Sequence, residues 1–404
     1  MKRFTIVGSG VYAATLCEQL AAAEISEQVE VVLAARNKER LEVIGNACRN
    51  RVEQAKPDWQ VRTETDLAAA VDGADIIVLL IRVGGLDARR YDETFPGQFG
   101  QIGDEGLGLG GISNTWRTIP VLDSVAQTIK ANAPNAQVIN MLAPLGTTTR
   151  LLTDAGLNTV GICELPITTE EKFGGNADLF DYGGINHLGW FTPKNAEAYE
   201  TLQAGMENGT VDREIVNQYG ATTLFYHYRV FNQLAAERMG CAFKPGRAAQ
   251  LQDLTDEVLD DFRNRPSEQS AALTARETPW FDRGLVPIVT ALLGGTEANG
   301  FVNTMNQHDG QRLVPQLADN AIVEVRAKWH SGGFTPTSSS LLTDECVKFL
   351  QAVSNADDLA YRGSVERDLS LIHQAIERLP ITMDRKDSAA VLSAISNQKL
   401  TKAA

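Results

Sequence analysis

The stretch Arg3-Phe4-Thr5-Ile6-Val7-Gly8-Ser9-Gly10-Val11-Tyr12-Ala13 decides the fold of this chain. It begins as an apolar run of strand composition, and the residues that follow, 14–23, have helical character. Gly-x-Gly-x-x-Ala between a strand and a helix is the fingerprint of a dinucleotide-binding turn, whose helix amino terminus attracts the pyrophosphate. The first glycine permits the turn, the second admits the pyrophosphate, and the alanine keeps the helix close to the strand. The residues predicted to contact the dinucleotide are Gly8, Ser9, Gly10 and Val11.

A second strand is expected over residues 29–33, and it leads to Arg36. Proteins that prefer NAD usually place an acidic residue here for the ribose hydroxyls, but this chain has Ala34 and Ala35. Arg36 is suited to the 2′-phosphate of NADP, although basic residues at a helix start also occur on solvated faces. The local sequence therefore leaves NAD and NADP both open.

Strand and helix patterns alternate through the first 160 residues. Apolar runs at 76–81, 137–142 and 159–163 are separated by amphipathic stretches such as 119–131. This alternation predicts a Rossmann-like, doubly wound and mostly parallel sheet. Ligands bind such sheets beyond the carboxyl ends of the strands, where the sequence places Cys163 and also Arg82, which we predict to contact the cofactor.

Helical patterns dominate beyond about residue 190. They cover 211–239, 285–293 and 369–378, with a few strands such as 321–325. We predict two lobes: a dinucleotide-binding domain over 1–190, and a mainly helical α+β domain over 191–404 for substrate binding and oligomerisation. The whole would be similar to lactate and malate dehydrogenases.

Composition indicates a soluble cytoplasmic protein. The formal charge of −14 over 404 residues argues against binding to nucleic acid or to an anionic membrane. No apolar run reaches the roughly 20 residues that span a bilayer, and the charged start lacks the features of a signal peptide. The 5 cysteines have no disulfide-framework spacing, which fits a reducing compartment.

Cys163 and His187 form a second candidate site. Gly-Ile-Cys-Glu-Leu-Pro at 161–166 and Gly-Gly-Ile-Asn-His-Leu-Gly-Trp at 183–190 both follow the nucleotide-binding part of the chain. A thiol and an imidazole in this arrangement suggest one divalent metal beside the dinucleotide. Taken alone, an isolated Cys or His is more often an ordinary core residue.

Three further motifs make the chain resemble glycoside hydrolase family 4. Residues 81–93 read Ile-Arg-Val-Gly-Gly-Leu-Asp-Ala-Arg-Arg-Tyr-Asp-Glu, residues 102–112 read Ile-Gly-Asp-Glu-Gly-Leu-Gly-Leu-Gly-Gly-Ile, and residues 117–121 read Arg-Thr-Ile-Pro-Val. The motifs occur in the family's order, with weaker echoes at 319–325. Because this family is NAD-dependent, it is an exception to glycoside hydrolysis by two carboxylates.

The resemblance implies an NAD- and divalent-metal-dependent glycosidase. NAD would remove hydride from C3 of the sugar, a base would remove the acidified C2 proton, the aglycone would leave from C1, and the hydride would then return. The metal, typically manganese, would be bound by Cys163 and His187 and would polarise the sugar oxygens. Asn140 is expected near the nicotinamide, and Asp104 and Glu105 near the cofactor and metal.

The chain departs from the family pattern at three catalytic positions. The family's Asn-Pro motif is Ala143-Pro144 here, which removes one sugar contact. Glu164 stands after the metal Cys, where it is predicted to act as general acid or else only to orient a ligand. The family's catalytic Tyr aligns with Thr223. Tyr226, His227 or Tyr228 could supply the base from a shifted register, and Tyr226 is the residue we expect to do so.

The substrate is expected to be an anionic glycoside, either a 6-phosphate or a uronate. Several arginines are available to bind the anion: Arg82, Arg89, Arg90, Arg117 and Arg283. The substrate-binding residues expected from the family are Arg89 and Asn186, together with Arg283. Family members are dimers or tetramers, so we expect a homodimer or homotetramer.

Two other functions remain open at this point. A simple NAD(P)-dependent sugar dehydrogenase would release an oxidised product, but it would leave Cys163 and His187 unexplained. A catalytically inactive relative that senses NAD(H) or a sugar is credible because of the changes at residues 143 and 223. Cofactor stoichiometry separates the three, since only a dehydrogenase consumes one cofactor per product.

Overall fold

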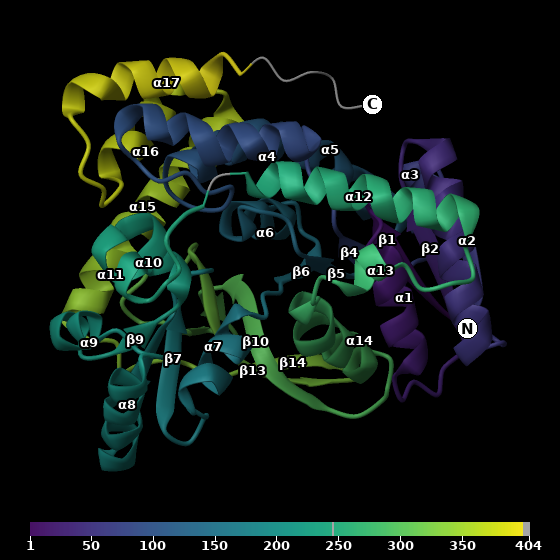
Figure 1. Cartoon of the computed structure of the whole chain (residues 1–404), viewed down its shortest axis with the longest axis horizontal. Helices are drawn as coiled ribbons and strands as arrows, with labels where there is room; N and C mark the ends of the chain where they lie inside the picture. The colour runs from purple at the N-terminus through teal and green to yellow at the C-terminus, as the bar shows by residue number, and fades with distance from the viewer. Residues whose placement is uncertain (245, 399–404) are drawn as a thin grey trace.

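A computed structural model describes residues 1–244 and 246–398 (Figure 1). One 12-stranded sheet runs through this part of the chain in the order β3-β2-β1-β4-β5-β6-β10-β13-β7-β8-β9, with β14 beside β13. Its strands are β1 (Lys2–Val7), β2 (Val29–Ala34), β3 (Gln60–Glu64), β4 (Ile76–Leu79), β5 (Gln137–Asn140), β6 (Asn158–Gly161), β7 (Phe180–Gly184), β8 (Trp190–Pro193), β9 (Thr222–Thr223), β10 (Ala298–Met305), β13 (Ile322–His330) and β14 (Gly333–Pro336). Strands β11 (Gln307–His308) and β12 (Gln311–Arg312) pair separately.

The amino-terminal half is the predicted doubly wound parallel sheet. Strands β1 to β6 all pair in parallel, and alternate residues of each strand face opposite layers of helices. Val31 and Leu33 belong to one apolar core, whereas Val32 between them belongs to a second. Each face of the sheet therefore buries its own core, as a doubly wound sheet requires.

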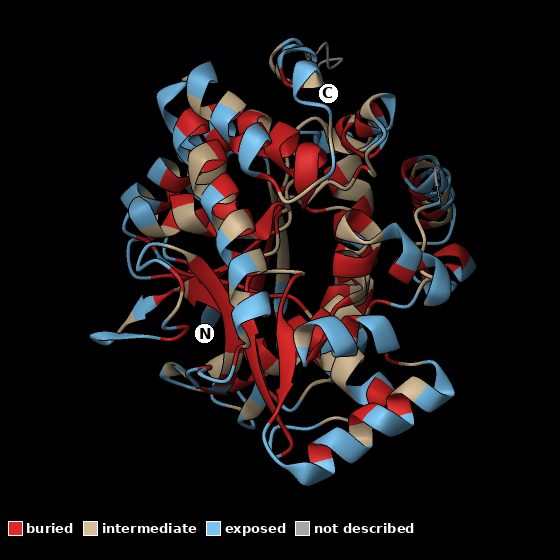
Figure 2. Cartoon of the chain, turned by 90° about the vertical axis from the view of Figure 1, so that its left-hand side faces the viewer, coloured by how far each residue is buried: buried red, intermediate tan, exposed pale blue. Residues whose placement is uncertain are grey.

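Helices cover both faces of this sheet. On one side α1 packs against α2 and α14, and on the other α5 packs against α3, α6 and α15. Figure 2 shows the buried strands between helices whose outer sides are exposed. The longer helices are α1 (Ala13–Ala22), α2 (Lys38–Ala55), α4 (Gly85–Thr94), α5 (Gly108–Asn132), α6 (Leu145–Asp154), α7 (Leu165–Phe173), α8 (Ala196–Asn208), α12 (Arg247–Asn264), α15 (Asp344–Glu366), α16 (Leu369–Arg378) and α17 (Ser388–Ser396). The shorter ones are α3 (Leu67–Val71), α9 (Arg213–Tyr219), α10 (Phe225–Phe231), α11 (Gln233–Arg238), α13 (Ala271–Thr274) and α14 (Val286–Leu292), with the short turns η1 (Phe95–Phe99), η2 (Trp280–Leu285) and η3 (Arg385–Asp387).

The second half continues the same sheet with antiparallel strands. Strand β10 pairs with β6 and with β13, and β7 lies on the other side of β13. Strand β7 belongs to the predicted first domain but hydrogen-bonds to strands of the second. The β10–β13 pair thus lies between β6 and β7 of the first half. Backbone hydrogen bonds from β6 to β10 and from β13 to β7 join the two halves in one sheet. The domain boundary near residue 190 stays a prediction.

The helical pattern predicted over residues 211–239 is interrupted in the structure. The segment divides into α9, β9, α10 and α11. Gly220 ends α9 in the left-handed region (φ 66°), and Thr222 and Thr223 then pair with Phe191 and Trp190 of β8. This long-range pairing overrides the helical pattern of the local sequence.

Helix α12 crosses from the second half to the amino-terminal sheet. In Figure 1 it runs below α4 and toward α2 on the right of the view, and it packs against both. Residues of the second half therefore lie beside the turns that follow the first strands. Within the described residues, no helix is long and apolar enough to cross a bilayer.

Candidate active site

The turn between β1 and α1 has the geometry that its sequence predicts. Gly8 has φ 94°, and a Cβ there would lie 2.6 Å from the nitrogen of Ile81. A Cβ at Gly10 would meet no atom within 4 Å, so this position faces open space. The first glycine is required by the fold, and the second leaves room for a ligand at the start of α1.

Arg36 and Asn140, which are also expected at the cofactor, differ in whether their side chains already have hydrogen-bond or ion-pair partners. Arg36 is exposed just after β2, and no ion pair involves it within the described chain. Asn140 is fully buried, and its amide donates to Thr148 (2.8 Å) and Thr149 (3.0 Å) of α6. Its carbonyl oxygen accepts a hydrogen bond from the backbone of Leu142, so this side chain already supports the local fold.

The five arginines expected to bind an anion are all paired with carboxylates. The pairs are Arg82 with Glu105 (3.0 Å), Arg89 with Glu93 (2.7 Å) and Glu105 (3.0 Å), Arg90 with Asp87 (3.0 Å), Arg117 with Asp92 (2.5 Å), and Arg283 with Glu171 (3.0 Å). Burial opposes ionisation of Glu105, but Arg82 and Arg89 lower its pKa to about 2. These contacts already use much of the hydrogen-bonding capacity of the arginines.

Sequence reasoning missed two arginines that lie near the dinucleotide turn. Arg276 donates to the Tyr12 hydroxyl (3.0 Å), and its guanidinium lies over the rings of Tyr12 and Trp280. Arg247 begins α12, and its pKa is lowered by burial and by the charges of Arg276 and Arg89. In the described residues neither Arg247 nor Arg276 has a carboxylate partner. No motif singled them out, because their proximity arises only in the folded chain.

His187 lies in the β7–β8 turn with an unusual backbone. The nitrogen of Leu188 donates to the oxygen of Ile185 (2.9 Å) to close the turn, and His187 has φ 65°. A residue with a β-carbon is strained in this region, and such strain often occurs at functional sites. The buried Nδ1 of His187 has no hydrogen-bond partner within the described chain. Burial lowers the pKa of His187 to about 4, against the opposing effect of Glu105, so the imidazole is neutral and able to bind a metal.

Cys163 lies two residues beyond β6 and is connected to the His187 turn. Burial, followed by the charges of Glu164 and Glu324, raises the pKa of its thiol well above the ordinary value, while a hydrogen bond with Asn186 opposes this rise. Asn186 directly precedes His187. The loops that carry the two predicted metal ligands therefore meet at the Asn186 side chain.

The residues present fit one divalent cation. The charges of Glu164 and Glu324 both act on the Cys163 thiol, and burial raises its pKa. A cation there would favour the thiolate, which the isolated protein disfavours. No cluster of three or more His, Cys, Asp or Glu side chains in the described part of the chain could hold a metal. Cys163 and the neutral His187 would be the two protein ligands that the family resemblance implies, and substrate or water oxygens would complete the shell.

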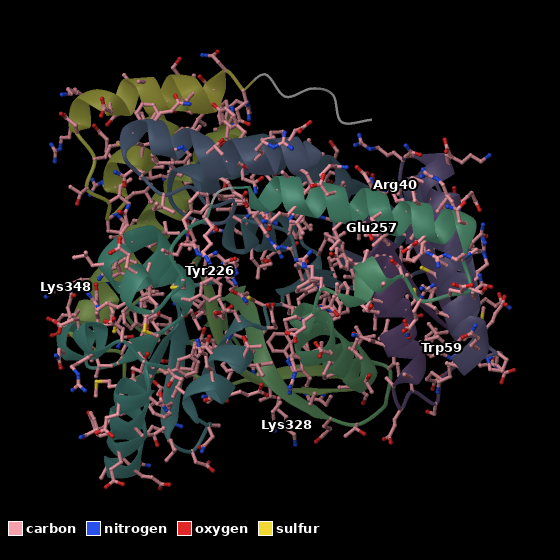
Figure 3. The ribbon with its side chains drawn as sticks, in the orientation of Figure 1. Arg40, Trp59, Tyr226, Glu257, Lys328 and Lys348 are labelled. Atoms are coloured by element: carbon pink, nitrogen blue, oxygen red, sulfur yellow. The ribbon has the colours of Figure 1, made fainter. Side chains whose placement is uncertain are left out.

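Tyr226 covers the imidazole of His187. Their rings stack with centroids 4.1 Å apart at 3°, and Tyr226, which belongs to α10, is labelled in Figure 3. Burial and the charge of Asp104 raise the pKa of Tyr226, although Arg229 and Arg89 oppose this. Thr223, which aligns with the family's catalytic Tyr, is buried and donates to the oxygen of Gly189 (2.7 Å). Tyr226 is thus the tyrosine beside the predicted metal ligand.

Asp104 and Glu164 are carboxyl groups with raised pKa values. Burial raises the pKa of Asp104 to about 6, with Glu105 adding to the effect and the Gly106 backbone opposing it. Burial also raises the pKa of Glu164, which lies 3.9 Å from the Cys163 sulfur. A carboxyl that retains its proton closer to neutral pH is suited to general acid catalysis.

Comparisons with known proteins agree with this fold. The model of the family described as "Family 4 glycosyl hydrolase" matches residues 4–177, and that of the "Family 4 glycosyl hydrolase C-terminal domain" matches residues 182–382. A probable 6-phospho-beta-glucosidase from Bacillus subtilis is 31% identical over 359 residues, which cover 82% of this chain and 80% of the relative.

Solved structures show the same fold. The 6-phospho-beta glucosidase from Thermotoga maritima, determined with manganese, NAD+ and glucose-6-phosphate, matches with a TM-score of 0.82 and 20% identity over 100% of both chains. Malate dehydrogenase from Plasmodium falciparum matches with a TM-score of 0.52 and 13% identity over 94% of this chain and 99% of that one. The dehydrogenase-like fold predicted from the sequence is thus confirmed.

Fold and family matches together define a glycoside hydrolase built on a Rossmann-like sheet. Since the two family models together cover most of the chain, this protein belongs to glycosyl hydrolase family 4.

Proposed function

We propose that this protein is a glycosidase that requires a nicotinamide dinucleotide and a divalent metal, and that cleaves an anionic glycoside by transient oxidation at C3. The arrangement around His187 carries this proposal: a neutral imidazole with an unpartnered Nδ1, a link through Asn186 to Cys163, and a stacked tyrosine. The names of the relatives support a 6-phosphorylated sugar, and their manganese and NAD+ support the two cofactors.

The chain contributes binding and positioning to the redox step. Gly8 and Gly10 shape the turn that would receive the pyrophosphate, and the amino terminus of α1 supplies a favourable dipole. When bound, the dinucleotide takes up hydride from C3 and returns it after cleavage. NAD is proposed as the cofactor, with NADP as the alternative offered by the exposed Arg36.

Four residues are assigned to the metal and to proton transfer. Cys163 and His187 would hold a divalent ion, manganese by preference, which polarises the sugar oxygens when bound. Glu164 would donate a proton to the leaving oxygen at C1, in keeping with its raised pKa. Tyr226 would accept the proton from C2; its buried hydroxyl needs the charge of the metal or of Arg229 to ionise.

The anionic group of the substrate is assigned to unpaired arginines. Arg276 and Arg247 lie near the dinucleotide turn and have no carboxylate partner among residues 1–244 and 246–398, whereas Arg89 and Arg283 are already paired. Two guanidinium groups beside one another favour a phosphate more than a neutral hydroxyl. Asn186 remains a candidate sugar contact, since its amide lies between the two metal-ligand loops.

We also propose a cellular compartment and an oligomeric state for this protein. All 5 cysteines are free in the structure, in keeping with a reducing cytoplasm. We propose a symmetric homodimer or homotetramer. Light scattering at micromolar protein concentration measures this, and a monomer would contradict it.

A glycoside panel tests the proposed activity. It contains α- and β-linked glycosides, each as the neutral sugar, the 6-phosphate and the uronate, assayed with and without MnCl2 and with catalytic NAD. Reducing sugar and the absorbance of reduced cofactor are followed together. We expect reducing sugar only with both additions, without accumulation of reduced cofactor.

Two other outcomes identify the alternative functions. Reduced cofactor formed one for one with product would indicate a dehydrogenase. Dinucleotide binding without turnover on any substrate would indicate an inactive relative. The threonine at position 223, which hydrogen-bonds inside the fold and provides no phenol, is the observation that favours this second candidate.

A further inference from the structure

A single row of paired residues crosses the sheet between the two predicted metal-ligand loops. Gly161 at the end of β6 pairs with Asn303 of β10, Asn303 pairs with Glu324 of β13, and Glu324 pairs with Gly184 at the end of β7. Cys163 lies two residues after one end of the row, and His187 lies three residues after the other. Three strand spacings of roughly 4.8 Å separate the two ends, so the loops must converge above the row to reach one ion.

The Glu324 carboxyl group connects this row to the loop above it. Its Oε1 accepts hydrogen bonds from the amides of Asn303 (2.8 Å) and Asn186 (3.0 Å), and its Oε2 accepts one from the Tyr182 hydroxyl (2.6 Å). Glu324 and Asn303 are both fully buried. The same Asn186 amide group interacts with the Cys163 thiol. A chain of side-chain contacts thus runs from Asn303 through Glu324 and Asn186 to Cys163.

This arrangement is costly for stability alone. Glu324 is a buried acid without an ion-pair partner among the described residues, and the Oδ1 of Asn303 is buried without a hydrogen-bond partner. Apolar side chains of similar size would fill such positions at less cost. The one contact that reaches beyond the strands is the hydrogen bond from Asn186, the residue that precedes His187.

We propose that Glu324 is a positioning residue, oriented by Asn303, that holds the Asn186 side chain in place and thereby sets the separation of Cys163 and His187. This inference rests on the proposed metal site. Glu324 itself binds neither metal nor substrate. Such outer partners fix the orientation of ligands, and their loss typically weakens metal binding by about 10- to 100-fold.

Metal titration tests this proposal without relying on activity. Binding of MnCl2 alone is measured by calorimetry on the wild-type protein and on three variants, and binding of NAD is measured in parallel. Glu324→Ala should weaken manganese binding by about 10- to 100-fold. Glu324→Gln should keep the affinity near the wild-type value, because its amide oxygen can accept from both asparagines and its NH2 can donate to Tyr182. Tyr182→Phe is the matched control, since it removes only the contact on Oε2.

A double variant tests the route through Asn186. Asn186→Ala should weaken manganese binding about as much as Glu324→Ala, and Glu324→Ala/Asn186→Ala should be no weaker than either single variant. If Glu324→Ala fails to fold, Glu324→Leu, which fills similar space but accepts no hydrogen bond, replaces it in both comparisons; Asn186→Ala remains usable because Asn186 is only half-buried. NAD affinity should stay unchanged throughout.

Three results would overturn the inference. Wild-type manganese affinity in Glu324→Ala would remove the positioning role. Fully additive losses in the double variant would show that Glu324 does not act through Asn186. No manganese uptake by the wild-type protein would overturn the proposed metal site itself, and this outcome is distinguished because it appears before any substitution is made.

Discussion

Two turns that leave strands of the same sheet are built in opposite ways. The turn after β1 reaches a positive φ at Gly8, where the absence of a side chain makes the conformation cheap. The turn after β7 reaches a positive φ at His187, where the side chain makes it costly. In the first turn, the glycine spacing itself supplies the required shape. In the second, the shape depends on contacts made far along the chain.

The supports of the second turn come from three distant segments. Tyr226 of α10 stacks on the imidazole, Glu324 of β13 holds Asn186, and Gly106 lies beside the unpartnered Nδ1. A strained residue persists only when its surroundings over-determine it. We infer that the first turn was selected for its shape and the second for the side chain that it presents.

The largest effect is expected from removing that side chain. His187→Ala should lower metal-dependent turnover by roughly 10⁴-fold, because a metal ion contributes several kcal/mol to the transition state. Dinucleotide affinity should remain, since the β1 turn is separate. His187→Gly should be equally inactive but more stable than His187→Ala by about 1 kcal/mol, because glycine relieves the positive φ. Steady-state kinetics and urea unfolding measure the two effects, and equal stability of the variants would contradict the strain at His187.

The second prediction uses the two glycines of the β1 turn. Gly8→Ala should cost about 3 to 4 kcal/mol of unfolding free energy, because its Cβ would meet the backbone of Leu80 and Ile81 within 2.8 Å. Gly10→Ala should leave stability nearly unchanged and weaken dinucleotide binding instead, since its Cβ meets nothing. Urea unfolding and NAD titration of both variants separate the roles. A fold loss in Gly10→Ala would show that the turn is not open at this position.

The third prediction concerns how pH changes the free energy of unfolding through Glu324, whose carboxyl group accepts a hydrogen bond from the residue before His187. Burial raises the pKa of Glu324 to about 7 from its ordinary 4.5, although hydrogen bonds from Tyr182, Asn303 and Asn186 oppose the rise. The pKa of Glu324 is higher in the folded protein than in the unfolded one. The contribution of Glu324 to the free energy of unfolding is therefore full below pH 4.5 and is lost as the pH rises to about 7. The shift corresponds to about 3 kcal/mol. Relative to Glu324→Gln, the wild-type protein should lose about this much unfolding free energy between pH 4.5 and 7; parallel pH curves would contradict it.

The smallest effect is expected at the end of β2. Arg36→Ala should weaken NADP binding by about tenfold and leave NAD binding nearly unchanged, because only NADP carries the 2′-phosphate that a guanidinium can contact. Fluorescence titration with both dinucleotides measures this. Strong selectivity of the wild-type protein for NAD would remove the argument for NADP.

Local sequence predicted the elements whose structure depends on near neighbours. Helix α16 spans Leu369–Arg378, as its pattern predicted, and β1 to β6 form the predicted parallel sheet. The break in the helical segment 211–239 was not predicted, because Thr222 and Thr223 pair there with strand β8, about thirty residues earlier in the sequence. Helical periodicity carries no information about such a partner.

In the candidate site too, the sequence predicted the residues that belong to local motifs. Gly8, Gly10, Cys163 and His187 follow from motifs and from the family resemblance, and in the structure Asn186, which precedes His187, contacts the Cys163 thiol. The ion pair between Arg89 and Glu105 could not be predicted, nor could the roles of Asn303 and Glu324, because each depends on a partner on another strand or loop. Such partners become visible only when the sheet is assembled.

The fate of the C2 proton tests the central claim most directly. The glycoside cleaved in the panel is turned over in D2O with catalytic NAD and manganese, and the product sugar is analysed at C2 by NMR spectroscopy. The proposed deprotonation predicts that deuterium appears at C2 of the product as the glycosidic bond is cleaved, while reduced cofactor does not accumulate. Cleavage that leaves protium at C2 throughout would contradict the account, because the bond would then have broken without exchange of the C2 proton with solvent.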